Sequence, residues 1–148
     1  MTPRWITPLV VVVLCSGFAG PLSRPAQSMN LPVNVGAANV SGRSQAILVD
    51  VNGLALYYLT SDTASTSACT GSCLTDRPAV LSDTVPPTPS SVPQVGFLGI
   101  AQSANGSQVT YDGHFLYRFT GDQRMGDANG EGLKGPQTGI WHVATPEL

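Results

Sequence analysis

Residues 56–62 read LYYLTSD, and residues 116–122 read LYRFTGD. A shift of 60 positions superimposes the two stretches, so the chain contains an internal repeat. Such self-similarity indicates that two related structural units build the fold together. The repeated positions that we single out are Leu56, Tyr57 and Asp62 in the first copy and Leu116, Tyr117 and Asp122 in the second.

The first copy follows a turn signal that lies between two apolar runs. The dipeptide Asn-Gly at residues 52–53 accepts the positive φ angles of a type I′ turn, which makes it a strong signal for a β-hairpin. A turn at this place predicts that Val49 pairs with Leu56, and that Tyr57 lies on the opposite face of the hairpin. Both faces are largely apolar, so we expect the hairpin to be covered on both sides.

The second copy repeats this arrangement with Asp-Gly at residues 112–113. This turn predicts that Val109 pairs with Leu116 and that Tyr117 lies on the other face. A third signal, Asn-Gly at residues 105–106, predicts a two-residue turn between two further strands.

Composition supports an all-β chain. Only 11% of the residues are charged, whereas Gly (16) and Pro (12) are frequent, and such a composition with many β-branched residues favours strands over helices. We expect a single antiparallel sandwich or open barrel, residues 29–148, built from two related hairpin units. The two copies occupy about residues 44–81 and 104–146, and a loop rich in Pro and Ser, residues 82–93, joins them. The weakly acidic balance excludes a basic surface for nucleic acid.

The first 28 residues have the pattern of a secretory signal peptide: a positive charge, a short apolar run, then small residues and prolines. The apolar run is about half of the ~20 residues that a membrane span requires. Cleavage after Ala19 and cleavage after Ser28 both fit the pattern. Cys15 follows the apolar run, but Leu14 before it is larger than lipid attachment requires, so we do not expect a lipid anchor.

Several motifs together resemble the bacterial "secreted repeat of unknown function" family. These motifs are the doubled LY-x-[LF]-T-x-D pattern, CTGSC after the first copy, and GDANGEG and GIWHV after the second. The resemblance covers about residues 44–146 and implies a cell-envelope or secreted protein, often a lipoprotein, with a Tyr-x-aromatic-x-x-Asp signature. It implies no activity. Residues 77–79 read Arg-Pro-Ala where the family usually has Trp-Pro-Pro, and Leu59 replaces an aromatic residue.

Cys69 and Cys73 are the two cysteines that remain once the signal peptide is removed. In an exported protein, this spacing predicts a disulfide that closes a small loop. The alternative is a soft-metal site for copper or zinc, or a redox site, in which His114 or His142 completes the ligands of the cysteine pair.

The loop after the second copy carries alternating oxygen ligands at Asp127, Asn129 and Glu131, followed by Gly132. This pattern matches the opening of a calcium-binding loop. The twelfth position is Thr138, where such a loop needs a Glu, and the same residue types also form ordinary turns, so the turn interpretation is favoured.

Asp62 and Asp122 end their strands at equivalent positions, where we expect each carboxylate to accept backbone N–H groups of the following turn. Tyr57 and Tyr117 are expected to be half-buried, with their hydroxyls in water.

We identify no catalytic constellation in the sequence, because it has two histidines and no Gly-x-Ser-x-Gly motif. We therefore expect an exported, non-enzymatic protein of the cell envelope or the medium that binds a partner or contributes structure. Its apolar second faces and exposed aromatic residues would form the partner surface. The alternative is a metal-binding or redox protein that uses the cysteine pair. Any chemistry is expected in the segments that follow the two copies, CTGSC and the acidic Gly loop.

Overall fold

A computed structural model of the chain describes residues 33–85 and 96–148. Its strands are β1 (Asn34–Val40), β2 (Arg43–Val49), β3 (Tyr57–Leu59), β4 (Leu98–Ser103), β5 (Gly106–Tyr111), β6 (His114–Phe115) and β7 (Trp141–Val143). Within these two ranges, helical structure is limited to a single turn, α1 (Cys73–Asp76), and a 3-10 turn, η1 (Pro136–Thr138). The all-β prediction is confirmed.

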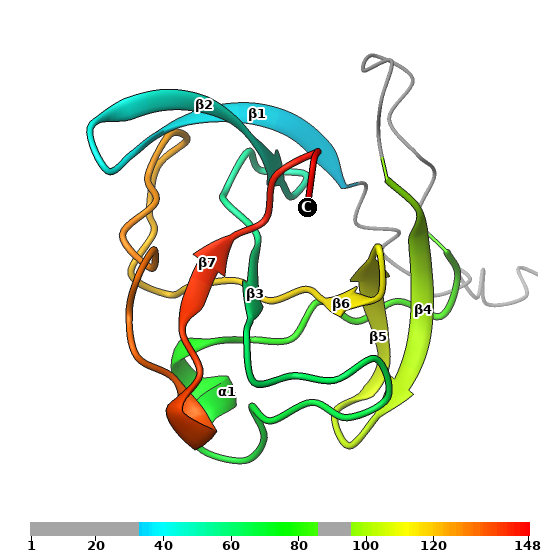
Figure 1. Ribbon diagram of the computed structural model, residues 1–148. Coiled ribbons are helices and arrows are strands. Elements are labelled where there is room, and N and C mark those ends of the chain that lie inside the picture. The colour runs from blue at the N-terminus through cyan, green and yellow to red at the C-terminus, as the bar shows by residue number, and fades with distance from the viewer. Residues whose placement is uncertain (1–32, 86–95) are drawn as a thin grey trace, which may run out of the picture.

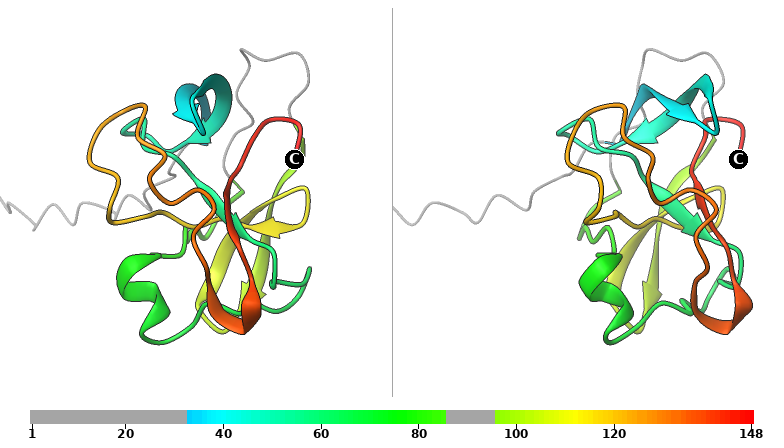
Figure 2. Two further views of the ribbon diagram at one scale, coloured as in Figure 1. Left: turned by 60° about the vertical axis from the view of Figure 1, so that its left-hand side comes forward. Right: turned by 90° about the vertical axis from the view of Figure 1, so that its left-hand side faces the viewer.

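The strands form three small antiparallel sheets: β1 with β2, β3 with β7, and β4 with β5 and β6. They pack as an open sandwich in which β3 lies between β7 and the three-stranded sheet (Figure 1). The side views in Figure 2 show β1 and β2 at one end of this packing and α1 at the other. The predicted signal peptide, its two cleavage positions and Cys15 lie outside the described residues, as does most of the predicted joining loop 82–93.

The two repeated stretches meet at the centre of the molecule. Tyr57 and Tyr117 exchange two backbone N–H···O bonds of 2.9 Å, so the two copies join directly as antiparallel strands. The segments that follow the copies then cross over. Strand β7 follows the repeated stretch 116–122 but pairs with β3 of the first copy, and Ala79 follows the repeated stretch 56–62 but pairs with Tyr117 of the second copy. Each copy therefore completes the other.

Two apolar clusters form the core, one on each side of the repeated strands. Leu56 and Leu116 lie in one cluster, and Tyr57 and Tyr117 lie in the other. This confirms that each leucine and the tyrosine after it face opposite sides, and that both sides are covered. Full burial of a large apolar side chain contributes about 1.5–3 kcal/mol.

The second hairpin has the predicted register. Tyr111 pairs with His114, and the Leu116 N–H donates to the Val109 carbonyl at 3.0 Å. The turn residues Asp112 and Gly113 have φ angles of 45° and 83°, as a type I′ turn requires.

The first hairpin differs from the prediction by one residue. Val49 pairs with Ala55, and the Leu56 N–H donates to the Leu48 carbonyl at 2.9 Å. A slip of one residue moves side chains to the other face of a strand. Val49 accordingly lies in the cluster of Tyr57, and the predicted pairing of Val49 with Leu56 is wrong.

Asp50 is the cause of this slip. Its Oδ1 accepts the N–H groups of Asn52 at 2.8 Å and of Leu54 at 3.1 Å. The Asp50 carbonyl accepts the Gly53 N–H, so the loop has three residues, and of these only Gly53 has a positive φ, 77°. The buried Asp50 carboxylate also pairs with Arg118 of the second copy, with 3.1 Å between Oδ2 and Nε.

The third predicted turn is shifted by one residue, and the structure has a further hairpin turn that was not predicted. Ser103 pairs with Gly106, so the third turn consists of residues 104–105 and not of residues 105–106. The β1–β2 hairpin turns at Ser41 and Gly42, whose φ angles are 52° and 84°. Ser-Gly is a known turn signal that the sequence analysis did not use.

The tyrosine hydroxyls bind carboxylates across the copies. Tyr57 Oη donates to Asp122 Oδ2 at 2.5 Å, and Tyr117 Oη donates to Asp62 Oδ2 at 2.8 Å. The predicted half-buried, water-exposed tyrosines are wrong, because both side chains are 0% exposed. Their partners lie 65 and 55 positions away in the chain, beyond the reach of local sequence patterns.

The other oxygen of each aspartate has the expected local role. Asp62 Oδ1 accepts the Ala68 N–H at 2.7 Å, and Asp122 Oδ1 accepts the Asn129 N–H at 2.9 Å. Each carboxylate thus fixes the segment after its own copy and also holds the tyrosine of the other copy. Buried polar groups need such partners, since an unsatisfied one costs about 1–3 kcal/mol.

We predict that Tyr57→Phe and Tyr117→Phe each lower the free energy of unfolding by about 1–3 kcal/mol, because each leaves a carboxylate oxygen without its donor. Urea denaturation measures the change. The control is Tyr58→Phe, since the hydroxyl of the half-buried Tyr58 forms no hydrogen bond in the described part of the chain, and a loss below about 0.5 kcal/mol is expected there. Equal losses for all three variants would contradict the assignment.

We also predict alkaline sensitivity. Burial raises the pKa of Tyr57 and Tyr117 above the ordinary value of 10.0. Above that pH the unfolded chain loses protons that the folded chain keeps, so the free energy of unfolding falls as pH rises, by about 1.4 kcal/mol per pH unit for each tyrosine. Urea denaturation between about pH 8 and pH 11 measures this slope. Tyr117→Phe should reduce the slope by the contribution of one tyrosine, about 1.4 kcal/mol per pH unit. An unchanged slope would count against the prediction.

Candidate functional site

A pocket of about 440 Å³ opens where the segments after the two copies meet. Figures 1 and 2 show α1 and the turn at the end of the acidic Gly loop at the same end of the molecule, and the rotated views of Figure 2 show them separated from each other. The pocket is lined by Ser72, Cys73, Asp76, Arg77, Phe119, Leu133, Lys134, Gly135, Pro136 and Trp141. Both segments in which the sequence analysis expected chemistry thus contribute to one site: CTGSC through Ser72 and Cys73, and the Gly loop through residues 133–135.

Arg77 lines the pocket, although it is only 4% exposed. Its guanidinium carbon lies 3.9 Å from the ring centroid of Phe119, 4.5 Å from that of Trp141 and 5.0 Å from that of Tyr57. Cation–π contacts of this kind contribute about 0.5–2 kcal/mol each. Three aromatic rings therefore compensate in part for the removal of this charge from water.

The polar partners of Arg77 are few. Nη2 donates to the Gly130 carbonyl at 3.2 Å, whereas Nη1 is buried without a hydrogen-bond partner among the described residues. Burial lowers the pKa of Arg77 from its ordinary value, but an arginine keeps its charge in proteins. The sequence analysis noted Arg77 only as a departure from a family pattern. The signal in the sequence was that Arg77 stands at a position where the family usually has a tryptophan.

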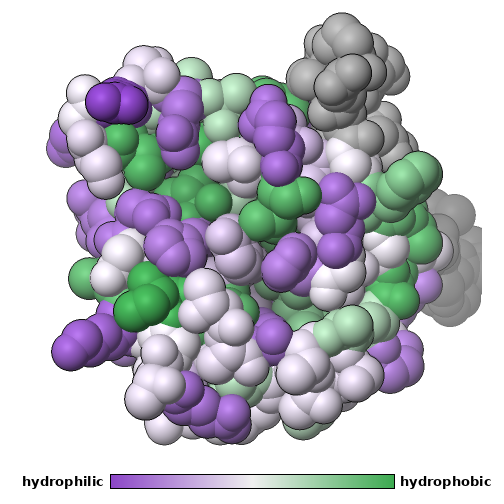
Figure 3. All heavy atoms as spheres, in the orientation of Figure 1, coloured by the Kyte–Doolittle hydropathy of each residue, from purple (hydrophilic) through white to green (hydrophobic). Residues whose placement is uncertain are grey.

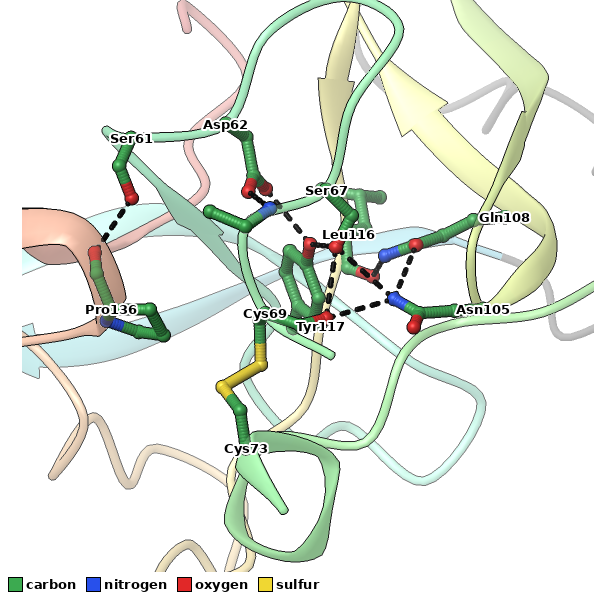
Figure 4. Close-up of a disulfide and its surroundings, with 11 residues drawn as sticks. Ser61, Asp62, Ser67, Cys69, Cys73, Asn105, Gln108, Leu116, Tyr117 and Pro136 are labelled. Atoms are coloured by element: carbon green, nitrogen blue, oxygen red, sulfur yellow. Dashed lines mark hydrogen bonds between the residues drawn. A yellow bond between two sulfur atoms is a disulfide. The ribbon is translucent and has the colours of Figure 1, made fainter. Parts of the chain in front are cut away.

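The predicted disulfide between Cys69 and Cys73 is present, with 5.4 Å between the α-carbons. Figure 4 shows its surroundings. The Cys69 carbonyl accepts bonds from Ser67 Oγ at 2.9 Å and from Asn105 Nδ2 at 3.0 Å. Ser67 Oγ also lies within hydrogen-bond distance of Tyr117 Oη, at 2.6 Å. The disulfide therefore connects the wall of the pocket to the buried tyrosine.

The residues of the alternative soft-metal site lie in two places. His114 and His142 flank Tyr58, with ring centroids 5.0 Å and 5.7 Å from the tyrosine ring. The cysteine pair lies at the pocket, and its disulfide uses both sulfurs. Within residues 33–85 and 96–148, no three His, Cys, Asp or Glu side chains are grouped so that they could hold a metal ion.

The residues of the calcium pattern bind different partners. Asp127 Oδ2 accepts the N–H groups of Gln123 and Arg124, both at 3.0 Å, and Asn129 Nδ2 donates to the Gly121 carbonyl at 3.3 Å.

Glu131, the third residue of that pattern, binds β7. Its Oε1 lies 2.7 Å from His142 Nδ1, and its Oε2 accepts the Val143 N–H at 2.6 Å. This arrangement favours the turn interpretation, in which Asp127 and Asn129 shape the loop and Glu131 attaches it to the sheet.

The partner surface that the sequence suggested is absent from the repeated strands, because both of their apolar faces belong to the core. Figure 3 shows one face of the molecule, where hydrophobic residues form small groups separated by hydrophilic ones. Across the described residues, no helix has both the length and the apolar character needed to cross a membrane.

Comparison with known proteins supports the resemblance in the second copy. No curated protein and no solved structure matches the chain. Residues 99–145 run from β4 through β7 and contain Tyr117, Asp122 and much of the pocket wall. These residues match the family model described as a secreted repeat of unknown function, which confirms that the chain is similar to this family over its second repeat copy.

Proposed function

We propose that this protein is an exported, non-enzymatic binding protein of the cell envelope or the medium, and that it holds a small molecule in the pocket between the two copies. The description of the similar family as secreted supports the location. The observation that carries the binding role is the pocket itself, whose volume of about 440 Å³ falls within the range of about 300–1,000 Å³ that ligand pockets have.

The walls of this pocket are held in place without a ligand. On one side the disulfide closes the loop that carries Ser72 and Cys73. On the other side, the backbone N–H of Trp141 donates to the Leu133 carbonyl at 2.9 Å, and the backbone N–H of Gly135 donates to the Gly139 carbonyl at 2.8 Å. A preformed site binds more tightly because less ordering accompanies association.

The chemistry of the lining also favours binding over catalysis. The residues that line the pocket combine apolar, aromatic and charged side chains but include no histidine, and Cys73 is held in the disulfide. A general base paired with a nucleophile is the usual requirement for covalent catalysis. The lining thus provides contacts for recognition, and the metal or redox alternative would first require reduction of the disulfide.

A blocking substitution tests this function. Ser72 is exposed and lines the pocket, so Ser72→Phe should fill the pocket without disturbing the core. We predict that compounds which shift the NMR resonances of residues 133–141, in a screen of diverse fragments at about 1 mM, bind at least tenfold more weakly to this variant.

The matched control is Ser44→Phe, which places the same ring on an exposed position of β2 outside the pocket. It should leave binding unchanged. If no fragment shifts the pocket resonances, or if both variants bind as the unmodified protein does, the pocket is not a binding site.

A further inference from the structure

We propose that the ligand of this pocket is a small organic oxyanion, a carboxylate or a phosphate monoester on a flat apolar body, which binds between Arg77 and Lys134. This inference rests on the proposed binding function and specifies its ligand class.

The first argument is the charge at the base of the pocket. Arg77 is buried, yet within the described residues neither it nor Lys134 forms an ion pair. Buried charges in proteins are normally paired, because the loss of hydration is costly. The aromatic rings around Arg77 compensate for only part of this loss. Asp122 and Asp76 act on Arg77 through their charges but form no ion pair with it, so an anion in the pocket would add a countercharge in direct contact.

The two cations have different roles in this arrangement. Arg77 is held between aromatic rings and provides a fixed positive charge in the pocket wall. Lys134 is exposed, so its ammonium group can reach an anion directly. Ser72 adds a hydroxyl that can donate a hydrogen bond to an oxyanion. Asp76 is the one carboxylate among the lining residues, and it is exposed, where water weakens its opposing effect.

The second argument is the apolar part of the lining. The pocket is also lined by the apolar side chains of Phe119, Leu133 and Pro136. Leu133 is 43% exposed, so its side chain is accessible to a ligand in the pocket. The volume of about 440 Å³ is at the small end of the range for ligand pockets, and this indicates a compact ligand, with one or two rings, over an extended polymer.

The experiment uses the full chain with Trp5→Phe, in which Trp141 is the only tryptophan and reports on the pocket by its fluorescence. The probes are benzoate, phenyl phosphate, inorganic phosphate, benzyl alcohol and benzylamine. Titration of the fluorescence gives the affinity of each probe. We expect benzoate or phenyl phosphate to bind at least tenfold more tightly than benzyl alcohol. Benzylamine should be the weakest probe, and inorganic phosphate should bind more weakly than phenyl phosphate.

Charge variants identify the groups responsible. Lys134→Gln should lower the affinity for the anionic probes about tenfold, and Lys134→Glu should lower it further. Both variants should bind benzyl alcohol as the unmodified protein does. Lys134 is exposed, so these variants keep the core intact. Arg43→Gln, which removes an exposed charge on β2 outside the pocket, is the matched control and should have no effect. Arg77→Gln should also weaken the anions, provided that its thermal unfolding shows a folded protein.

The outcomes separate the two proposals. If benzyl alcohol or benzylamine binds as well as the anions do, or if Lys134→Glu leaves anion binding unchanged, the ligand class is wrong while the binding pocket stands. If inorganic phosphate binds as tightly as phenyl phosphate, the apolar body is not recognised and that part fails. If neither these probes nor the fragment screen shows any binding at the pocket, both proposals fail.

Discussion

The structure depends on two reciprocal hydrogen bonds, in which the tyrosine hydroxyl of each copy donates to an aspartate of the other copy. Tyr57 binds Asp122 and Tyr117 binds Asp62, so each copy holds a carboxylate of which one oxygen accepts a hydrogen bond from the other copy. In a core with little water, a carboxylate without its donor is costly. The backbone bonds between Tyr57 and Tyr117 place the hydroxyls correctly for this exchange. A single copy would therefore leave buried polar groups unpaired as well as apolar surface exposed.

The same crossing explains where the pocket lies. The Thr60 N–H donates to the Ile140 carbonyl at 3.1 Å, and the Thr120 N–H donates to the Asp76 carbonyl at 3.0 Å. These equivalent bonds attach each trailing segment to the strand of the other copy, so both segments reach the same end of the molecule. Arg77 and Trp141 then follow at equivalent positions beside the pocket. The repeat is nearly symmetric there, except that the first copy has Arg77 where the second has Trp141, and this difference places a cation in the pocket wall.

Local sequence signals predicted the fold where nothing competed with them. Asp112 and Gly113 form the expected turn, and the second hairpin has the expected register. In the first hairpin, Asp50 accepts two backbone N–H groups and converts the Asn-Gly turn into a three-residue loop, which no pattern of apolar residues reveals. The tyrosine–aspartate pairs were also missed, because they join residues more than fifty positions apart. The one sign of these pairs in the sequence was that Tyr and Asp recur at the same spacing in both copies.

The disulfide acts mainly by positioning. A loop as short as Cys69–Cys73 gains only about 2 kcal/mol from closure, which is small for a covalent link. Its location is more informative: Cys73 lines the pocket, whereas the Cys69 carbonyl is bound by Ser67, the residue that contacts the Tyr117 hydroxyl. One end of the bridge therefore belongs to the site and the other to the most constrained part of the core. Because the two are separated by a single short loop, the disulfide links the pocket wall to the hydrogen bonds of Tyr117 with Ser67 and Asp62.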